Sequence, residues 1–555
     1  MGSGPYRAGS GAEETSVPGD AGIVGELIEQ FADPLAFYRE LIQNAIDAGT
    51  ESIRVSLVWE GLGEQGGEGE PPSGVTHVSV RDEGEGMDRD VLENQLLVLF
   101  RSGKEGQEGK IGKFGVGFVS VLAVQPSVVV VHTSRGGGRA WALHLHPDQS
   151  YDLFELEGGE ASGTTVTLRV PMGRDEYEGF IDRSERALRR WCRHARVPIR
   201  FSAQLSGATD PLTDVRVDRD LDLQAIVSVE RTYDGVGRLV VGLGPPGKPY
   251  SAFFNQGLLL WETIGPLIHP FSFKVQDSRL EHTLSRDNVR RDAAFERALA
   301  AVREAAREQL PTAAFSALED AARSCRDGHY LALATSLAEA YPERHLRWTF
   351  PLIEPIGEQR TIRATDVSDR PLHSQTRSEL TAALAEQRVP VVDVGEEGEL
   401  LAVVTSVLRG RPRDAHASLT LVVPVEPTAV DLLLLEKVCE HLRLVVRSPN
   451  GPVLATLVGA GARRAVMSAG EGGRPWVVTE REASQDPLRF LARPRMVINA
   501  SNRLVAAARR RAALDPELAA TTLARAVLLW TRRLDEETDE ALATAGLEHL
   551  LGGAR

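Results

Sequence analysis

The spacing of apolar residues along the chain predicts alternating segments of helix and strand. Within Gly25–Ile46 apolar side chains recur every three to four positions, which is typical of an amphipathic helix. Ser52–Trp59 and Val75–Val80 alternate apolar and polar residues, which predicts two strands. Further strands are predicted at Val128–His132, Ala140–His146 and Thr164–Val170. We therefore expect residues 21–172 to fold as one α/β unit.

The pattern beyond this unit predicts several more domains. Residues 1–20 are rich in Gly, Ser and acidic side chains, which predicts a flexible tail. After the α/β unit come a predicted helical connector, a strand-rich region and a helical region, at Pro171–Asp214, 215–280 and Asn288–Ala340. A second α/β pattern begins near Pro351, with a helix at Ser378–Glu386 and a strand at Val389–Val394. Residues 514–553 are rich in Ala and Leu and are expected to be helical.

Composition agrees with a folded protein of several domains. The chain has 555 residues, 42% of them hydrophobic, which excludes a largely disordered chain. That length suggests about three to four domains. The formal net charge of -15 disfavours nucleic acid and anionic membranes as partners. Three cysteines without a C-x-x-C pair, no visible secretory signal and no membrane-spanning apolar run together predict a cytoplasmic location.

The first candidate cluster lies in the predicted N-terminal helix, at Glu40, Asn44 and Asp47. Positions i and i+4 share a helix face, so Glu40 and Asn44 are expected to point the same way, one turn apart. A carboxylate beside a carboxamide can position a water molecule and hold a hard cation. The alternative is the solvent-facing side of an ordinary amphipathic helix.

The second cluster is Asp82–Met87, with the sequence DEGEGM, directly after a predicted strand. Its glycines permit a sharp turn and a close backbone approach to a flat ligand. The Asp82 carboxylate can accept a hydrogen bond from an exocyclic amine, and Met87 offers a soft apolar wall. An ordinary acidic turn is the alternative.

The third cluster is the glycine-rich segment Gly112–Phe118, with the sequence GKFGVGF, ahead of a helical stretch. Glycines before a helix leave backbone N–H groups free to bind phosphate. The spacing excludes a Walker A loop, and no strand directly precedes the segment, as a dinucleotide fingerprint requires. Half of the six lysines, Lys104, Lys110 and Lys113, lie in or just before it. This local positive charge suits a polyanionic ligand.

In this order, and followed by Gly163-Thr164-Thr165, the clusters resemble the Bergerat-type ATP-binding fold of the GHKL superfamily. That superfamily includes gyrase-type topoisomerases, heat-shock protein 90 chaperones, sensor histidine kinases and mismatch-repair MutL proteins. The segments FYRELIQNAIDA, FRSG, IGKFGVGF and SGTTVTL are most similar to the bacterial type of heat-shock protein 90.

The resemblance implies a multidomain α/β (α+β) fold. It consists of an N-terminal Bergerat-fold α/β sandwich, an α/β middle region and a helical or mixed C-terminal domain. The expected parts are a tail, an ATP-binding domain, a linker with a large middle domain, a small α/β middle subdomain and a dimerisation-like domain, at 1–20, 21–172, 173–345, 346–425 and 426–555.

The resemblance also implies roles around ATP and Mg²⁺. Glu40 would orient or deprotonate the attacking water, and Asn44 would hold Mg²⁺ against the phosphates. Asp82 would accept from the adenine amine, with Thr164 joining through a water molecule. The other implied ATP-binding residues are Asp47, Gly86, Met87, Arg101, Ser102, Lys113, Gly115, Val116, Gly117 and Phe118.

A segment of the middle region, Leu284–Asn288, resembles the catalytic loop of that family. The resemblance implies that Arg286 reaches the terminal phosphate of ATP, where a planar cation stabilises developing charge. The alternative is a helix-capping segment with a solvent-facing arginine. Two departures from the family are a shorter segment between Phe100 and Ile111 and no expected strand ahead of the first helix.

The function implied is that of an ATP-dependent chaperone. ATP binding and hydrolysis would drive domain closure on unfolded or partly folded client proteins, in a homodimer formed through the C-terminal domain. One alternative is a nucleotide-gated scaffold or regulatory ATPase that clamps one dedicated partner. The other is a DNA-acting ATPase of the same superfamily, which the acidic charge disfavours.

Overall fold

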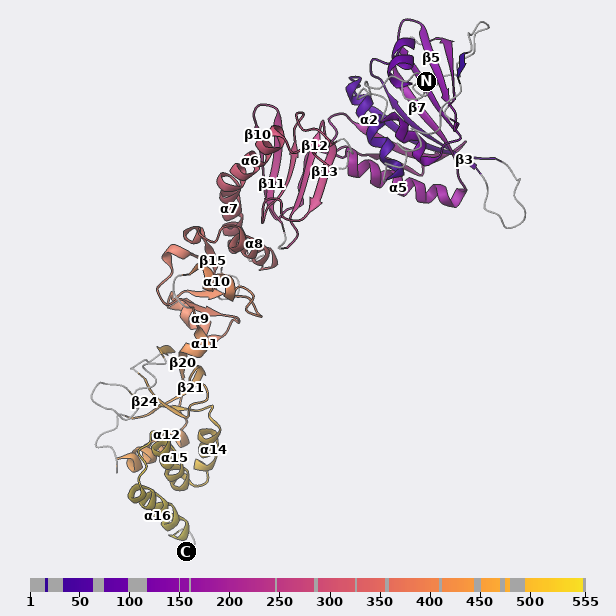
Figure 1. Cartoon of the computed structure of the whole chain (residues 1–555). Coiled ribbons are helices and arrows are strands. Elements are labelled where there is room, and N and C mark those ends of the chain that lie inside the picture. Colours follow the sequence, from indigo (N-terminus) through magenta and orange to yellow (C-terminus); the bar gives the residue numbers. More distant parts are fainter. Residues whose placement is uncertain are drawn as a thin grey trace. The chain divides into compact units, whose positions relative to one another are not determined.

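The computed structural model divides the chain into two units, residues 1–310 and 311–555 (Figure 1). The structure describes residues 15–17, 33–62, 74–97, 117–148, 150–158, 161–244, 247–283, 288–324, 327–354, 359–408, 412–443, 451–469, 475–479 and 495–552. The fold is mixed α/β in both units, which confirms the predicted fold class. Within these described ranges, no helix has the length and apolar character needed to cross a bilayer.

The first unit contains a nine-stranded sheet in the order β1-β6-β5-β4-β7-β3-β2-β8-β9. Its strands are β1 (Thr15–Val17), β2 (Ile53–Gly61), β3 (Gly74–Asp82), β4 (Val128–Arg135), β5 (Arg139–Leu145), β6 (Tyr151–Glu157), β7 (Ser162–Pro171), β8 (Ile199–Leu205) and β9 (Thr213–Arg216). Neighbouring strands are antiparallel except β2 and β8, which pair in parallel. The strands predicted at β2, β3, β4, β5 and β7 are thus confirmed.

Two expectations about this sheet are wrong. A strand does precede the first helix, because β1 pairs with residues 151–153 of β6. With only three residues and a partner far along the chain, β1 has no local pattern that reveals it. Pro171–Asp214 is not wholly a helical connector, since β8 and the first two residues of β9 lie within it. Alternate residues of β8 are buried, and the sheet therefore continues past residue 172.

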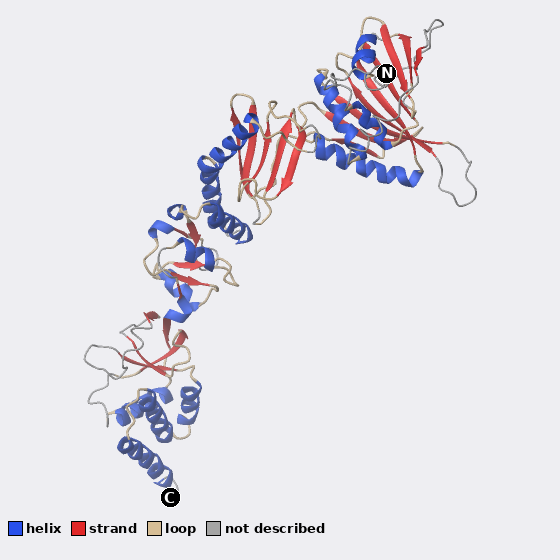
Figure 2. Ribbon diagram, viewed as in Figure 1, coloured by secondary structure: helices blue, strands red, loops and turns tan. Residues whose placement is uncertain are grey.

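Helices α2 (Phe37–Asp47) and α5 (Arg174–Cys192) pack against this sheet (Figures 1 and 2). The buried face of α2 follows the predicted spacing, at Phe37, Tyr38, Leu41, Ile42, Ala45 and Ile46. The Tyr38 hydroxyl lies 3.0 Å from Ser184 Oγ and joins α2 to α5. Tyr177 donates to the carbonyls of Leu57 and Gln204 and so joins α5 to β2 and β8.

Shorter helical segments complete this part. They are 3-10 helices at Pro34–Ala36 and Phe118–Val124, and α3 (Arg89–Val91), which continues as a π-helical turn at Leu92–Leu96. Asp33 and Asp88 cap the first and third of these with their carboxylates. Both the Phe118–Val124 segment and α2 bury apolar side chains in one core with the sheet.

A five-stranded sheet follows in the same unit, in the order β10-β11-β14-β12-β13. Its strands are β10 (Val227–Tyr233), β11 (Gly237–Leu243), β12 (Tyr250–Asn255), β13 (Leu258–Ile264) and β14 (Ser272–Gln276). Helix α6 (Ala293–Glu308) packs on it, with the Phe295 ring 5.0 Å from the Phe253 ring. The strand-rich and helical predictions for this region are confirmed. Residues such as Val240 and Phe254 belong to the same buried core as the nine-stranded sheet.

The second unit has three small sheets, of two, three and five strands. Their strands are β15 (Thr349–Pro351), β16 (Thr361–Arg363), β17 (Leu372–Ser374), β18 (Val391–Asp393), β19 (Arg413–Asp414), β20 (Leu419–Pro424), β21 (Val453–Gly459), β22 (Val466–Ala469), β23 (Trp476–Thr479) and β24 (Arg495–Asn499). The three-stranded sheet, β18-β17-β19, is parallel, and the helix and strand predicted after residue 377 are confirmed as α9 (Glu379–Glu386) and β18.

The helices of the second unit pack beside these sheets and form most of its C-terminal part. They are α7 (Leu310–Arg323), α8 (Asp327–Ala340), α9 (Glu379–Glu386), α10 (Leu401–Val407), α11 (Ala415–Ser418), α12 (Ala429–Leu442), α14 (Arg503–Ala512), α15 (Pro516–Trp530) and α16 (Glu536–Gly552). Helices α12, α14 and α15 share a core with β21 and β24, and Leu542 of α16 joins it. The predicted helical region at the C-terminus is confirmed.

Candidate nucleotide-binding site

Helix α2 carries the first cluster of predicted site residues. Glu40 is buried, with 7% of its surface exposed, and its carboxylate lies 3.3 Å from the guanidinium of Arg39. Asn44 and Asp47 are exposed further along the helix. The helix therefore presents a sheltered carboxylate one turn before an accessible carboxamide, as the spacing predicted. That pair is suited to holding a water molecule next to a cation.

Asp82 is the last residue of β3 and faces Thr164 across the β3–β7 pair. The N–H of Gly84 donates to Asp82 Oδ1 at 2.9 Å, and the Thr164 N–H also donates to this carboxylate. Burial raises the pKa of Asp82, and the two N–H groups only partly oppose this. The structure thus holds a partly desolvated hydrogen-bond acceptor in a fixed orientation.

The turn after Asp82 is attached to the elements around it by its own backbone. The Glu85 N–H donates to the Ala48 carbonyl at 3.0 Å, which brings the turn against the end of α2. Gly86 has φ +67°, and a Cβ there would lie 1.9 Å from the Ser134 carbonyl oxygen. Only glycine fits at this position, so the predicted role of Gly86 in shaping the site has a steric basis.

Thr133, on β4, is a supporting residue that the sequence analysis did not identify. Its buried hydroxyl accepts from the Met87 N–H at 2.8 Å and lies 3.0 Å from Thr164 Oγ1. It also donates to the Gly163 carbonyl at 3.2 Å. One hydroxyl therefore joins the Asp82–Met87 turn to β7. The only sequence signal is a threonine two residues after the apolar run Val128–Val131 of β4.

Of the third cluster, only the last two residues, Gly117 and Phe118, are among those that the structure describes. Gly117 and Phe118 begin the 3-10 helix Phe118–Val124, and the Phe118 side chain is buried in the core. The Ser120 hydroxyl donates to the Gly117 carbonyl at 2.6 Å. Because the ring of Phe118 faces the core, its expected contribution to phosphate binding would come from the backbone. Arg101, Ser102, Lys113, Gly115 and Val116 lie outside the described residues.

Arg286 also lies outside the described residues, but both flanks of its segment are anchored. Thr283 N–H donates to the Asn288 carbonyl at 2.9 Å, so the flanks approach each other. On the N-terminal side, the fully buried Asp277 accepts from the Tyr233 hydroxyl and from Arg279.

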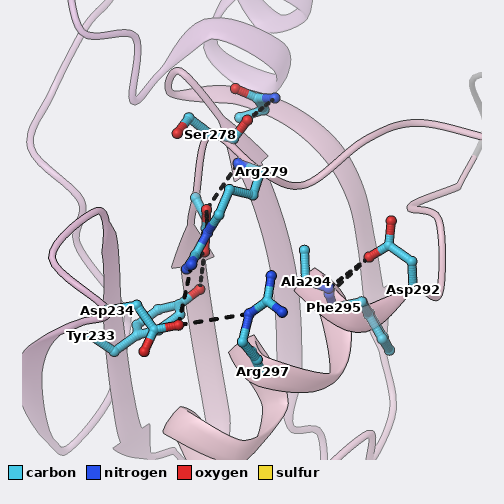
Figure 3. Close-up of polar contacts among 10 residues, drawn as sticks. Tyr233, Asp234, Ser278, Arg279, Asp292, Ala294, Phe295 and Arg297 are labelled. Atoms are coloured by element: carbon cyan, nitrogen blue, oxygen red, sulfur yellow. Dashed lines mark hydrogen bonds and ion pairs between the residues drawn. The ribbon is translucent and has the colours of Figure 1, made fainter.

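On the C-terminal side, Asp292 caps α6 by accepting from the N–H groups of Ala294 and Phe295 (Figure 3). Figure 3 also shows Arg279 reaching toward Tyr233 and Asp234.

The described residues offer few protein ligands for a metal. No group of three or more His, Cys, Asp or Glu side chains among them could hold an ion. Mg²⁺ commonly takes one or two protein oxygens and completes its shell with phosphate oxygens and water. The exposed carboxamide of Asn44 fits that requirement when a triphosphate supplies the other oxygens.

A family comparison covers part of this arrangement. Residues 38–152 match the model described as histidine kinase-, DNA gyrase B- and HSP90-like ATPase. The chain carries a GHKL-type ATPase domain. The match begins in α2, includes Glu40, Asn44 and Asp82, and ends in β6, before Thr164. ATP binding is the general activity of such domains. No curated protein matches the chain.

Proposed function

We propose that the chain is an ATP-driven molecular chaperone of the heat-shock protein 90 type. It would bind and hydrolyse ATP to drive domain closure on unfolded or partly folded client proteins. The observation that carries the proposal is the docking of the Asp82–Met87 turn against the end of α2, within a GHKL-type ATPase domain. This docking brings Asp82, the proposed acceptor for adenine, to the end of the helix that carries Glu40 and Asn44.

In the proposed mechanism, Asp82 accepts a hydrogen bond from the exocyclic amine of adenine, and Thr164 joins through a water molecule. Met87 packs against the base. Asn44 would contribute its carboxamide oxygen to a Mg²⁺ bound together with ATP, which would supply positive charge beside the phosphates. Glu40 orients the attacking water or accepts its proton, and its partly sheltered position keeps bulk water from competing.

Arg286 completes the proposed site from the middle region. Its guanidinium would stabilise charge on the terminal phosphate in the transition state, so hydrolysis would require closure of this region onto the nucleotide. Hydrogen bonds at Asp277 and Asp292 hold the described residues on either side of its segment, and this anchoring supports the proposed role.

We further propose that the chain forms a homodimer through its C-terminal region. Leu514, Leu529 and Leu551 of that region are 81%, 62% and 76% exposed. These side chains are available for contact with a second copy of the chain, and this exposure supports the proposal. Light scattering should give twice the chain mass. A mass equal to one chain would contradict the dimer.

The deciding experiment measures steady-state ATP hydrolysis by the wild type and by Glu40→Ala, each with and without an unfolded client protein. We expect Glu40→Ala to bind ATP with nearly unchanged affinity and to lose turnover. Glu178→Ala, on the exposed surface of α5, is the matched control and should keep wild-type turnover.

A second readout separates the chaperone from the alternatives. The chaperone should suppress the aggregation of several unrelated unfolded proteins in an ATP-dependent way. A single co-purifying partner with no such suppression would favour a dedicated scaffold, and turnover stimulated by DNA would favour a DNA-acting ATPase.

A further inference from the structure

A cavity of about 810 Å³ lies in the first unit, away from the Asp82–Met87 turn. It forms where the segments on either side of β8 and β9 meet β11 and β14 of the five-stranded sheet. Its charged lining residues are Arg196, Arg216, Asp218, Arg219, Asp220 and Arg238. The volume lies in the range of small-molecule sites, and arginine is its most frequent charged side chain.

The carboxylate of Asp218 is paired with Arg216 and does not offset the charge of the other three arginines in the cavity. One of its carboxylate oxygens accepts the Ile199 N–H at 2.7 Å, and the other accepts Arg216 Nε at 2.8 Å. Asp218 is buried and wholly occupied by these contacts, so it neutralises Arg216 alone.

An excess of positive charge remains in the cavity. Arg238 lies 3.8 Å from the carboxylate of Glu230, whereas in the described part of the chain Arg196 and Arg219 have no carboxylate within ion-pair distance. His194 adds no charge at neutral pH, because burial and the neighbouring Lys274 lower its pKa to about 4. A site with this balance favours an anion in a chain whose net charge is -15.

The wall of the cavity is held in place from behind. Gly257 has φ +82°, and a Cβ there would lie 1.7 Å from the His194 carbonyl oxygen, so the β12–β13 turn packs directly on this backbone. The buried Lys274 Nζ lies 2.9 Å from His194 Nε2. The wall therefore forms without a ligand, which lowers the entropic cost of binding one.

Arg196 connects the cavity to the helix that carries the ATPase residues. Its Nη2 donates to the Ile46 carbonyl in the last turn of α2 at 3.2 Å. Its own N–H donates to the Gln256 carbonyl, and the Gln256 side chain donates to Asp47 at 3.2 Å. A ligand that draws the Arg196 guanidinium into the cavity competes directly with the contact to α2.

We propose that this cavity binds a small molecule with two or more phosphate or carboxylate groups, and that the bound ligand changes ATP turnover through Arg196 and α2. Guanidinium groups recognise both kinds of oxyanion with paired hydrogen bonds. The effect on turnover rests on the proposed ATPase function, whereas binding to the cavity does not.

Calorimetric titration of the full chain with pyrophosphate and, separately, with citrate tests binding, in low salt without Mg²⁺. We expect one site per chain for at least one probe. Arg219→Gln/Arg238→Gln should weaken that binding at least about tenfold, because two charge-assisted contacts are lost. Asp220→Asn should strengthen it. Arg139→Gln, at an arginine outside the cavity with 80% side-chain exposure, is the matched control and should bind like the wild type.

The two probes identify the ligand class. Tighter pyrophosphate binding assigns the site to phosphorylated ligands, and tighter citrate binding assigns it to polycarboxylates. Equal affinity of the double variant and the wild type would place the probe elsewhere and overturn the proposal, as would no binding of either probe.

Turnover distinguishes this proposal from the ATPase function itself. The probe should change the wild-type ATPase rate and have no such effect in the double variant. If the cavity binds the probe and the rate is unchanged, the coupling through Arg196 is wrong. If the wild type hydrolyses no ATP, the proposed function fails, and the titration still decides the cavity.

Discussion

Asp82 and Thr164 face each other across β3 and β7, and the Thr164 N–H donates to the Asp82 carboxylate. Two adjacent strands thus fix the orientation of one partly buried acceptor before any ligand arrives. Because the Asp82 side chain is held in place before binding, replacing its carboxylate with an amide changes the hydrogen-bonding group and leaves its position unchanged.

Asp82→Asn should weaken ATP binding by about 1.5–3 kcal/mol, since the amide presents a donor or a weaker acceptor to the adenine amine. Titration calorimetry with ATP measures this directly. Asp90→Asn, at an exposed position of α3, is the control and should keep wild-type affinity. Normal ATP binding by Asp82→Asn would show that another residue recognises the base.

Thr133→Val tests whether the buried hydroxyl supports the site. Removing it leaves the Met87 N–H without its acceptor, and we expect a loss of about 1–3 kcal/mol in the free energy of unfolding together with weaker ATP binding. Thr76→Val is a close control, because the Thr76 hydroxyl is also buried but has no hydrogen-bond partner among the described residues. Chemical denaturation should show Thr76→Val to be neutral or stabilising. Equal losses in the two variants would contradict the supporting role of Thr133.

Gly86→Ala and Gly137→Ala separate steric collision from backbone strain. Both glycines have positive φ, +67° and +79°, but a Cβ at Gly137 meets nothing within 4 Å. We expect Gly137→Ala to cost about 1 kcal/mol of stability and to leave ATP affinity unchanged. Gly86→Ala should cost more and should lose ATP binding, because the new methyl group displaces the turn from β4. Thermal unfolding and ATP titration measure the two effects, and similar behaviour of both variants would rule out the collision.

The buried Asp431, on α12, should give the second unit an acid-sensitive contact. Arg509 Nε and Nη2 donate to its two oxygens at 2.6 and 2.8 Å, and these bonds hold the pKa of Asp431 well below its usual range. A carboxyl group whose pKa is lower in the folded state stabilises the folded protein at pH values above its unfolded-state pKa of about 3.9. This stabilisation is lost as the pH falls toward the folded-state pKa.

Asp431→Asn should therefore lower the free energy of unfolding by about 1.5–3 kcal/mol at pH 7. The gap between wild type and variant should narrow between pH 5 and pH 3. Asp366→Asn, in an exposed pair, should stay within about 0.5 kcal/mol of the wild type. Scanning calorimetry across this pH range provides the measurement, and a gap that stays constant with pH would contradict the assignment.

Periodicity predicted the elements that carry the site because those elements are regular and half-buried. The i, i+4 spacing placed Glu40 and Asn44 on one helix, and alternation placed Asp82 at the end of a strand. What periodicity cannot express is contact between distant segments. Thr133 acquires its role only when β4 lies beside β7, and nothing near it in the chain differs from an ordinary strand.

The same limit explains the unpredicted parts of the fold and the cavity. β1 and β8 are defined by partners far away in sequence, β6 and β2. The arginines of the cavity come from separate segments, and each resembles any solvent-facing arginine of this arginine-rich chain. Their shared surroundings exist only after the five-stranded sheet packs beside the first one.

The parallel pairing of β2 with β8 also affects how the protein is made. During synthesis β2 and β3 leave the ribosome early, but the strand that covers the other side of β2 ends only at Leu205. Until then, β2 has an open edge that can pair with another nascent chain. Assembly of the nucleotide-binding part therefore depends on a later strand, and the residues just before that strand, Arg196–Pro198, line the arginine-rich cavity.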